Sequence, residues 1–512
     1  MDSTSLFVYQ PIYQQRRKPE DNDLIDIVKN LPYYYDKNNE KYVLLKKKEN
    51  FAIEKITSKE FASYIQKVVK QMFPSFATRN QISSLIQYLD LFIEENGKLI
   101  KFYNRLAMHD SKIYIELHNK EKINVEIDEQ DWRLVTKVEV YFTKHSHLAE
   151  LPIPTRNGNL SSYLLALGVH DELDKILLTS WLICCLFVDK SRPHLWIIGE
   201  HGTGKTSLAN GLRDLVDPCD NPLFLNKKVT DLAQIIDHNA IPIFDNISVI
   251  NKEISDFFCS TYTGTNFIKK KIYTDDEDFT FNIKKPLIIT SICTGKVAQD
   301  LMSRTFFFPR AKLKVTKPDF ILKEELDRLR PGALGALLTA VSGTMRILPT
   351  ISSTCQVRTA DFEVIGLAAA EALGYGKDKF IQVLERNEKY KRALFAKMIP
   401  SIEALSGFMK NQQMWTGTLS ELLAALLGVA DDPKLLPKSA NYLSRDLKQA
   451  DQALSENGYI IQQLPNTSNG RPYMIINTNY KVPVESINYE TGEVSTEVYN
   501  QALIYQPEIV KK

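Results

Sequence analysis

The stretch Gly199-Glu-His-Gly-Thr-Gly-Lys-Thr206 decides the fold of this chain, because it fits the phosphate-loop pattern GxxxxGK(S/T). The apolar run Leu195–Ile198 lies directly before it and predicts a buried strand, and Ser207–Leu212 follows with the apolar spacing of a helix. Strand, glycine loop and helix form the context that the pattern requires. The sequence therefore predicts an α/β domain that binds a polyphosphate.

The residue types in this loop explain how it would hold a nucleotide. Three glycines let the backbone curl so that its N–H groups face the phosphates, and the helix that follows directs its positive end at the same anion. Lys205 is placed to reach the β and γ phosphates, and the Thr206 hydroxyl is placed to bind Mg²⁺. We therefore expect ATP and Mg²⁺ as cofactors, bound by Gly199, Glu200, His201, Gly202, Thr203, Gly204, Lys205, Thr206 and Ser207.

Two further apolar strands follow the loop, and each ends in polar residues. Ala240–Asn246 carries Asp245, which suits a Walker B acid that holds Mg²⁺ through water. Pro286–Ser291 carries Thr290, which stands where ATPases of the additional-strand class (AAA+) place sensor 1 to orient the attacking water. Arg304, before an apolar strand, is placed like an arginine finger that acts on the γ-phosphate of a neighbouring subunit.

Several segments together resemble AAA+ helicase-like proteins of phages and integrated mobile islands, among them the minichromosome-maintenance-like replicative helicases of staphylococcal cassettes and pathogenicity islands. The segments are GEHGTGKTSLANGLRDLVDP, IPIFDN, FIKKKIYTDDEDFTF, KKPLIITSI and DLMSRTFFF, and the resemblance covers about residues 100 to 480. It implies an ATP-driven DNA helicase that assembles as a homo-oligomeric ring, a hexamer. Single-stranded and forked DNA are the implied substrates, and a primase or other replication proteins are the implied further partners.

The resemblance raises two questions about catalysis. Most AAA+ ATPases place Glu directly after the Walker B Asp, whereas this chain has Asn246, which cannot accept a proton. Hydrolysis is then slow, or another carboxylate substitutes. Glu200 is the nearest candidate in sequence, and the proteins that this chain resembles also have Glu at this position. Arg358 falls where the family has an Arg like sensor 2, and a surface arginine at a helix start is the alternative interpretation.

The segment between the Walker B strand and the sensor 1 strand predicts a β-hairpin. Phe267–Tyr273 and Phe279–Ile283 alternate apolar and polar residues around the acidic connection Thr274–Asp278. Related ring helicases carry a hairpin here that enters the central pore, where cations grip phosphates. The resemblance therefore implies DNA contacts by Lys269, Lys270 and Lys271, with Lys284 and Lys285 on the return. A solvated hairpin with ordinary surface lysines is the alternative.

The C-terminal region predicts a winged helix. Thr418–Leu427 and Ala440–Glu456 have helical spacing, and Tyr459–Gln463 with Pro472–Ile476 forms a hairpin. In such folds one helix enters the major groove and the wing touches the backbone. The candidate DNA contacts are Arg445, Lys448 and Arg471. A winged helix that packs on protein is the alternative.

Composition narrows the class of protein. The chain has 512 residues, 44% of them hydrophobic and 25% charged, which indicates several globular domains. Its net charge of +2 gives no global basic bias, so nucleic-acid contacts must come from local patches. We expect no membrane association, because no apolar run reaches the ~18 residues of a bilayer span. Six scattered Cys without a Cys/His cluster predict reduced thiols, no zinc and a cytoplasmic location.

The predicted fold class is α/β: an AAA+ phosphate-loop ATPase core with a helical lid, an N-terminal mixed α/β region and a C-terminal winged helix. The predicted units are an N-terminal domain (1–97), a small β-rich module (98–150), a linker with helices (151–190), the ATPase core (191–330), the lid (331–410) and the winged helix with a tail (411–512). Two functions remain open. One is a ring-forming helicase that replicates a mobile element or phage, and the other is a nucleotide-switched regulator or loader that does not translocate.

Overall fold

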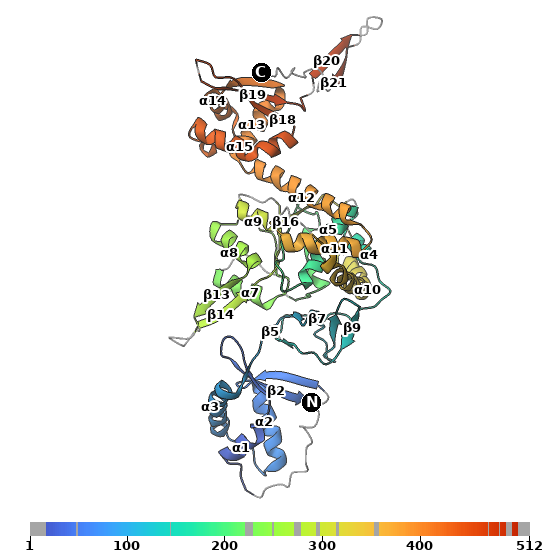
Figure 1. Ribbon diagram of the computed structural model, residues 1–512, viewed down its shortest axis with the longest axis vertical. Helices are drawn as coiled ribbons and strands as arrows, with labels where there is room; N and C mark the ends of the chain where they lie inside the picture. The colour runs from blue at the N-terminus through green and yellow to red at the C-terminus, as the bar shows by residue number, and fades with distance from the viewer. Residues whose placement is uncertain are drawn as a thin grey trace.

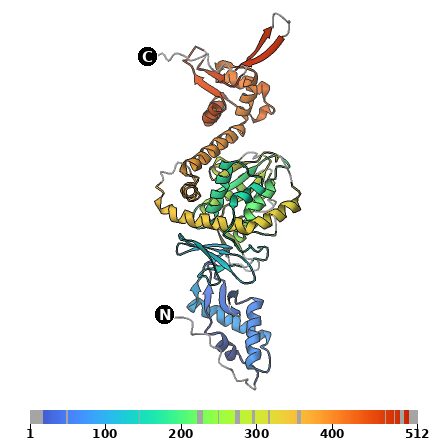
Figure 2. The ribbon, with the colours of Figure 1, turned by 90° about the vertical axis from the view of Figure 1, so that its right-hand side faces the viewer.

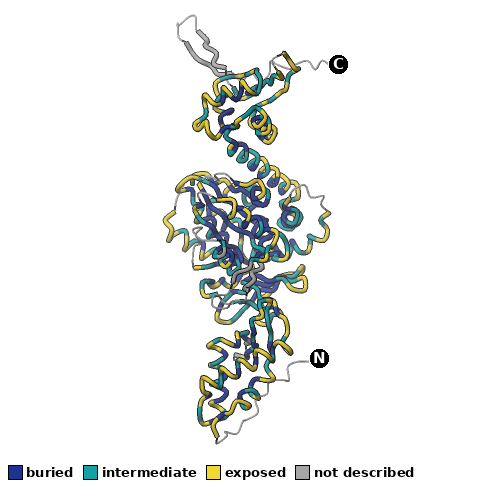
Figure 3. Tube along the Cα trace, turned by 90° about the vertical axis from the view of Figure 1, so that its left-hand side faces the viewer, coloured by how far each residue is buried: buried dark blue, intermediate teal, exposed yellow. Residues whose placement is uncertain are grey.

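The computed structural model describes residues 17–47, 50–143, 145–220, 229–247, 250–270, 278–292, 297–313, 317–352, 358–468, 470–480, 482–487 and 494–499. These residues form units arranged along one long axis, with the N-terminal domain at one end and the C-terminal domain at the other (Figure 1). The phosphate-loop domain lies in the middle, where the buried residues are most concentrated (Figure 3). The order of units along the chain is therefore also their order in space.

The N-terminal domain is mixed α/β, as predicted. Its elements are α1 (Asp21–Val28), β1 (Tyr33–Tyr35), β2 (Lys41–Lys47), β3 (Asn50–Lys55), α2 (Lys59–Met72), α3 (Arg79–Asn96) and β4 (Lys98–Leu99). Ser58 and Thr78 accept hydrogen bonds at the starts of α2 and α3, which satisfies free backbone donors there. The sheet order is β3-β2-β1-β4, so this domain extends to Leu99.

The small β-rich module consists of β5 (Phe102–Tyr103), β6 (Leu106–His109), β7 (Lys112–Glu116), β8 (Asn124–Ile127), β9 (Trp132–Val135) and β10 (Tyr141–Phe142). Strands β6 to β9 form an antiparallel sheet in chain order. Arg105 is 1% exposed and bonds Asp217 of the phosphate-loop domain at 3.1 Å, as well as the Ala149 carbonyl at 2.7 Å. This buried ion pair fixes the module to the domain that follows.

The phosphate-loop domain is built on a parallel sheet. Its strands are β11 (His194–Ile198), β12 (Ile243–Phe244), β15 (Ile288–Ser291) and β16 (Thr305–Pro309), in the order β12-β15-β11-β16. The apolar runs of the sequence suit strands that are covered on both faces. The covering helices are α4 (Leu160–Ala166), α5 (Glu172–Leu186), α6 (Lys205–Asp214), α7 (Val229–His238), α8 (Lys252–Thr263) and α9 (Gln299–Ser303). The predicted α/β core with parallel strands is confirmed.

Helix α10 (Asp319–Ile347) begins before the predicted lid. The sequence placed the boundary between the ATPase core and the lid after residue 330, but Pro331 lies inside one 29-residue helix that crosses the phosphate-loop domain (Figure 2). An interior proline costs about 3 kcal/mol. Burial of Leu334, Leu337 and Leu338 offsets this, at roughly 1.5–3 kcal/mol per leucine. By length and composition alone the helix could span a bilayer, but half of its most apolar window is buried inside the fold.

The linker predicted at 152–159 lies against α10. A Cβ on Gly158 would stand 1.9 Å from the Gly332 carbonyl oxygen, and a Cβ on Gly335 would stand 1.9 Å from the Thr155 carbonyl oxygen. The Thr155 N–H also donates to the Pro331 carbonyl at 3.0 Å. The glycines therefore allow two backbones to touch, and the segment is held at fixed contact rather than left as a free linker.

Three further helices lie within the range predicted for the helical lid (331–410): α11 (Ala360–Ala372), α12 (Lys377–Lys397) and α13 (Pro400–Phe408). Helix α12 leaves the phosphate-loop domain and leads to the C-terminal domain (Figure 1). Its Tyr390 and Leu394 pack on the core of the phosphate-loop domain, whereas Ala396 belongs to the core of the C-terminal domain. One helix therefore joins two hydrophobic cores.

The C-terminal domain has the predicted order of two helices followed by a hairpin, and the winged helix stays a prediction. Helices α14 (Leu419–Val429) and α15 (Ala440–Glu456) precede the hairpin β18 (Tyr459–Gln463) and β19 (Pro472–Asn477). A strand that the sequence did not predict, β17 (Met414–Thr418), pairs with β19 and completes a three-stranded antiparallel sheet. A separate hairpin, β20 (Val482–Ile487) and β21 (Val494–Tyr499), follows.

Candidate functional site

The loop after β11 has the backbone of an anion-binding turn. Gly202 and Gly204 have φ values of +72° and +74°, in the left-handed region that favours glycine. A Cβ on Gly199 would stand 2.5 Å from the Arg310 carbonyl oxygen, so this position also excludes a side chain. Helix α6 begins at Lys205 directly after the loop, and no side chain caps its N-terminus, so its first N–H groups suit an anion.

The Lys205 ammonium is folded over the loop. It donates to the carbonyls of Gly199 at 2.8 Å and Glu200 at 2.7 Å. Burial lowers the pKa of Lys205, and the Asp245 charge opposes this effect. The cation is therefore held at the loop with a carboxylate nearby.

Asp245 and two hydroxyl groups form a compact cluster beside the loop. The Thr206 hydroxyl donates to the Asp245 carboxylate at 3.0 and 3.1 Å, and the Thr290 hydroxyl donates to its Oδ1 at 2.5 Å. The Asn246 N–H donates to Thr290 Oγ1 at 2.8 Å. Asn246 is exposed at φ +56°, which asparagine tolerates better than most residues. Thr290 thus holds the Asp245 carboxylate, and its predicted role in orienting water stays a prediction.

The other predicted loop residues lie where the sequence placed them. The Thr203 hydroxyl donates to the Glu200 carbonyl at 2.9 Å, which closes the loop. The Glu200 and His201 side chains are exposed at the loop, and Ser207 is half-buried on α6. Glu200 as the substitute for the missing acid stays a prediction.

Arg310, which was not among the predicted site residues, supports the backbone of the loop. This residue is 8% exposed, and its guanidinium donates to the Thr203 carbonyl at 3.0 Å and to the Leu167 carbonyl. Its own N–H donates to the Ile198 carbonyl at 2.6 Å. The available signal was an arginine directly after the apolar run that forms β16, at the strand end nearest the loop.

Arg304 lies at the end of the parallel strands that is opposite to the phosphate loop. Its carbonyl accepts from the His194 N–H at 3.0 Å, so it stands beside the first residue of β11, whereas the loop follows the last. The Arg304 side chain is 9% exposed and pairs with Asp300. Arg358 joins the same carboxylate at 2.6 Å. The structure therefore brings together two arginines that the sequence assigned to separate roles.

The predicted hairpin is present as β13 (Thr265–Lys270) and β14 (Asp278–Ile283), paired antiparallel. Lys269 and Lys270 lie on β13, and Lys271 lies outside the described residues. Lys284 and Lys285 are not displayed on the return strand as predicted: Lys284 donates to the Asp189 carbonyl at 2.9 Å, and burial lowers the pKa of Lys285 to about 8. Both lie at the base of the hairpin, because their backbone turns back into the sheet.

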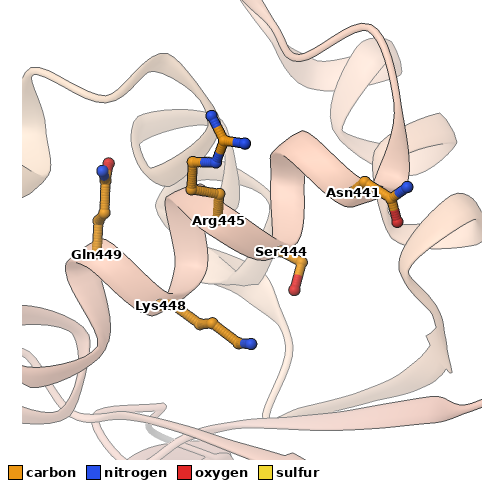
Figure 4. Close-up of a pocket in the computed structure, with 5 residues that line it drawn as sticks. All are labelled: Asn441, Ser444, Arg445, Lys448 and Gln449. Carbon is orange, nitrogen blue, oxygen red and sulfur yellow. The ribbon is translucent and has the colours of Figure 1, made fainter.

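One face of α15 lines a shallow cavity of about 390 Å³. Its lining residues are polar or basic and recur at helical spacing (Figure 4): Asn441, Ser444, Arg445, Lys448 and Gln449. In this view Arg445 and Gln449 extend toward one edge of the face, and the other three extend toward its other edge. Arg471, on the loop between β18 and β19, is also exposed. This face combines cations with amides and carries no carboxylate among its lining residues.

The fold and the site define a mixed α/β phosphate-loop protein. Residues 164–380 match the family model of the Actinomycete integrative conjugative element replication protein, AICE RepA. Residues 402–486 match the model of the AICE RepA C-terminal domain, so the two models together span more than half of the 512 residues. Both ranges are therefore similar to replication proteins of integrative conjugative elements.

Similarity to other known proteins is distant. The apo structure of the NrS-1 C-terminal region is 11% identical, with a TM-score of 0.39, over 90% of this chain and 100% of that chain. The X-ray structure of JCV helicase is 14% identical, with a TM-score of 0.22, over 50% of this chain and 65% of that chain. The curated proteins contain no match to the sequence. The family models thus carry the relationship.

Proposed function

We propose that this protein is an ATP-driven DNA helicase that works as a ring during replication of its element. The observation that carries the proposal is the placement of the phosphate loop and Arg304 at opposite ends of the parallel strands of one sheet. The strand β16 between these ends has five residues, which span roughly 16 Å at about 3.3 Å per residue. This separation supports a role for Arg304 at the nucleotide of a neighbouring subunit.

The residues at the loop fit ATP with Mg²⁺. The glycine turns and the α6 N-terminus would bind the phosphates, Lys205 would neutralise their charge, and Thr206 with Asp245 would hold the cation. Bound nucleotide would supply the driving free energy. Thr290 fixes the orientation of Asp245, and Arg310 fixes the loop backbone.

Two surfaces would contact DNA. The polar face of α15 suits the major groove of a duplex, because Arg, Asn and Gln are the side chains that pair with base edges there. The β13–β14 hairpin projects from the phosphate-loop domain toward the N-terminal side of the molecule (Figure 1) and would carry Lys269 and Lys270 to a single strand. A duplex site and a strand site on one chain suit a replication helicase.

Lys205→Ala and Arg304→Ala test this function. Lys205→Ala should abolish ATP turnover, because the phosphates lose their main cationic partner. Arg304→Ala should lose turnover about 10³-fold or more yet still bind ATP, since an arginine finger acts on the transition state. Mixing the two variants should restore activity at mixed interfaces. Near-normal turnover in Lys205→Ala would sink the site assignment, and mixed rings without activity would contradict the trans role.

A nucleotide-switched regulator or loader is the second candidate. Asn246 favours it, because the position next to Asp245 lacks a base and slow hydrolysis suits a switch. Unwinding of a forked duplex separates the two functions. The helicase should unwind the fork with ATP, and replacing Lys269, Lys270 and Lys271 with Ala should reduce unwinding far more than basal hydrolysis. A protein that binds ATP and DNA without unwinding is the regulator.

A further inference from the structure

Asp300 binds two arginines that come from different elements. The Arg304 guanidinium, directly after α9, pairs with Asp300 Oδ2 and donates to the Asp300 carbonyl at 2.9 Å. The Arg358 guanidinium, before α11, lies 2.6 Å from Asp300 Oδ1. The hydrogen bond from Arg304 is the largest of the effects that lower the pKa of Asp300. One ionised carboxylate thus holds two cations, and the group keeps a net positive charge.

The packing around this group fixes Arg304 more tightly than Arg358. The Tyr262 ring lies 6.0 Å from the Arg304 guanidinium carbon, and Cys259 of α8 hydrogen-bonds the Asp300 carboxylate. The Arg304 side chain is 9% exposed, whereas those of Arg358 and Asp300 are 53% and 50% exposed. The carboxylate therefore anchors one buried and one accessible guanidinium at the same end of the parallel strands.

We propose that Asp300 is a positioning residue that holds Arg304 and Arg358 as a pair facing the nucleotide of a neighbouring subunit. This inference rests on the proposed ring ATPase. It assigns Arg358 to the neighbour's site, whereas the resemblance implied only a role like that of sensor 2. The reason is geometric, because Arg358 contacts a residue at the end of the strands away from its own phosphate loop. A guanidinium held in place loses less conformational freedom when it binds phosphate.

Asp300→Asn tests the positioning role, because it keeps the size of the side chain and removes its charge. The turnover number of assembled rings should fall about tenfold or more, while the Kd for nucleotide stays unchanged. Asp300→Glu should recover part of the loss, and mixing Asp300→Asn with Lys205→Ala should restore turnover. The matched control is Asp327→Asn, whose partner Arg330 lies 2.8 Å away on α10 and whose side chain is similarly exposed. Wild-type turnover in Asp300→Asn rings would overturn the proposal.

Arg358→Ala tests the trans assignment without disturbing a buried side chain. Alone it should lower the turnover number, and mixing it with Lys205→Ala should restore activity. Restoration requires Arg358 and the phosphate loop to come from different subunits, since a residue acting within its own subunit leaves both kinds of site defective. Failure of restoration in rings shown to form by native mass spectrometry overturns the inference. A Lys205→Ala protein that still hydrolyses ATP would instead refute the proposed function itself.

Discussion

At the scale of single residues, the site depends on side chains that hold other side chains. Thr290 bonds the Asp245 carboxylate, and Arg310 bonds the loop carbonyl of Thr203. Neither contact transfers a proton or binds a phosphate. Each restrains a group that is proposed to bind the metal ion or the phosphates: the Asp245 carboxylate or the loop backbone. Such restraint usually maintains the precise geometry of a site.

The phosphate loop was predictable to the residue, because its pattern encodes a local backbone shape and needs no distant partner. Asp245 and Thr290 were predictable as neighbours, since the ends of parallel strands meet at one edge. The roles of Thr290 and Arg310 were not predictable, because they depend on which atom each side chain reaches across the sheet. The anchoring of Lys284 and Lys285 escaped prediction for the same reason, since exposure is a tertiary property.

Lys285 gives a pH prediction. Burial lowers its folded-state pKa from 10.5 to about 8, so the folded protein disfavours the charged form. Below about pH 8 this destabilisation is fully present, and it is relieved as the pH rises from about 8 toward 10.5. Lys285→Met should therefore raise the free energy of unfolding at pH 7 by on the order of 1–2 kcal/mol. This gain is smaller than the pKa shift alone would imply, because the side chain is partly exposed and solvent screens its charge.

Thermal unfolding at pH 7 and pH 10 checks this expectation. The gain from Lys285→Met should be largest at pH 7 and should shrink at pH 10. Lys252→Met, at an exposed lysine on α8, is the control and should change the unfolding transition at neither pH. An equal gain at both pH values would show that the added stability comes from apolar packing and not from the buried charge.

At the scale of elements, α15 carries its chemistry as a periodic face. Leu443, Leu447 and Ala450 pack into the domain core, and the intervening polar residues point outward. The helical period was readable from the sequence, and so were two of its cations. The sequence could not show that Asn441, Ser444 and Gln449 join them in one hollow, because that depends on the three-dimensional arrangement of the side chains.

The face predicts distinct effects for its two cations. Arg445→Ala should weaken binding to the preferred duplex by about 1–3 kcal/mol and relax sequence preference, if the guanidinium reads a base edge. Lys448→Ala should weaken binding to all duplexes alike and reduce the slope of log K against log salt by about 1. Fluorescence anisotropy across a salt series measures both.

Lys434→Ala is the control for this experiment, because Lys434 is exposed in the same domain but lies off α15, in the short 3-10 helix Pro433–Leu435. It should leave both the affinity and the salt slope unchanged. If all three variants behave alike, the face does not contact DNA, and the alternative of a winged helix that packs on protein gains support.

At the scale of the whole molecule, the close contact between 152–159 and α10 joins the β-rich module to the phosphate-loop domain. A methyl group at Gly335 would stand 1.9 Å from the Thr155 carbonyl oxygen, so Gly335→Ala must push the two backbones apart. We expect this variant to lower the free energy of unfolding by about 1–3 kcal/mol, as overpacking usually does. It should also expose the 152–159 segment to limited proteolysis.

Gly407→Ala supplies the matched control. Gly407 lies in α13, and an added Cβ meets nothing within 4 Å. Alanine there should be neutral or slightly stabilising, because it has the better helix propensity. If Gly335→Ala is as well tolerated and as resistant to protease as Gly407→Ala, the contact between the linker and α10 is not what holds the two units together.

Helix α12 joins the two hydrophobic cores without a break. A continuous helix advances about 1.5 Å and turns about 100° with every residue. The number of residues in α12 therefore sets two quantities together. One is the distance between the α15 face and the parallel sheet, and the other is the rotation of that face about the α12 axis. A one-residue deletion would barely shorten the reach, but it would swing the face by more than a quarter turn.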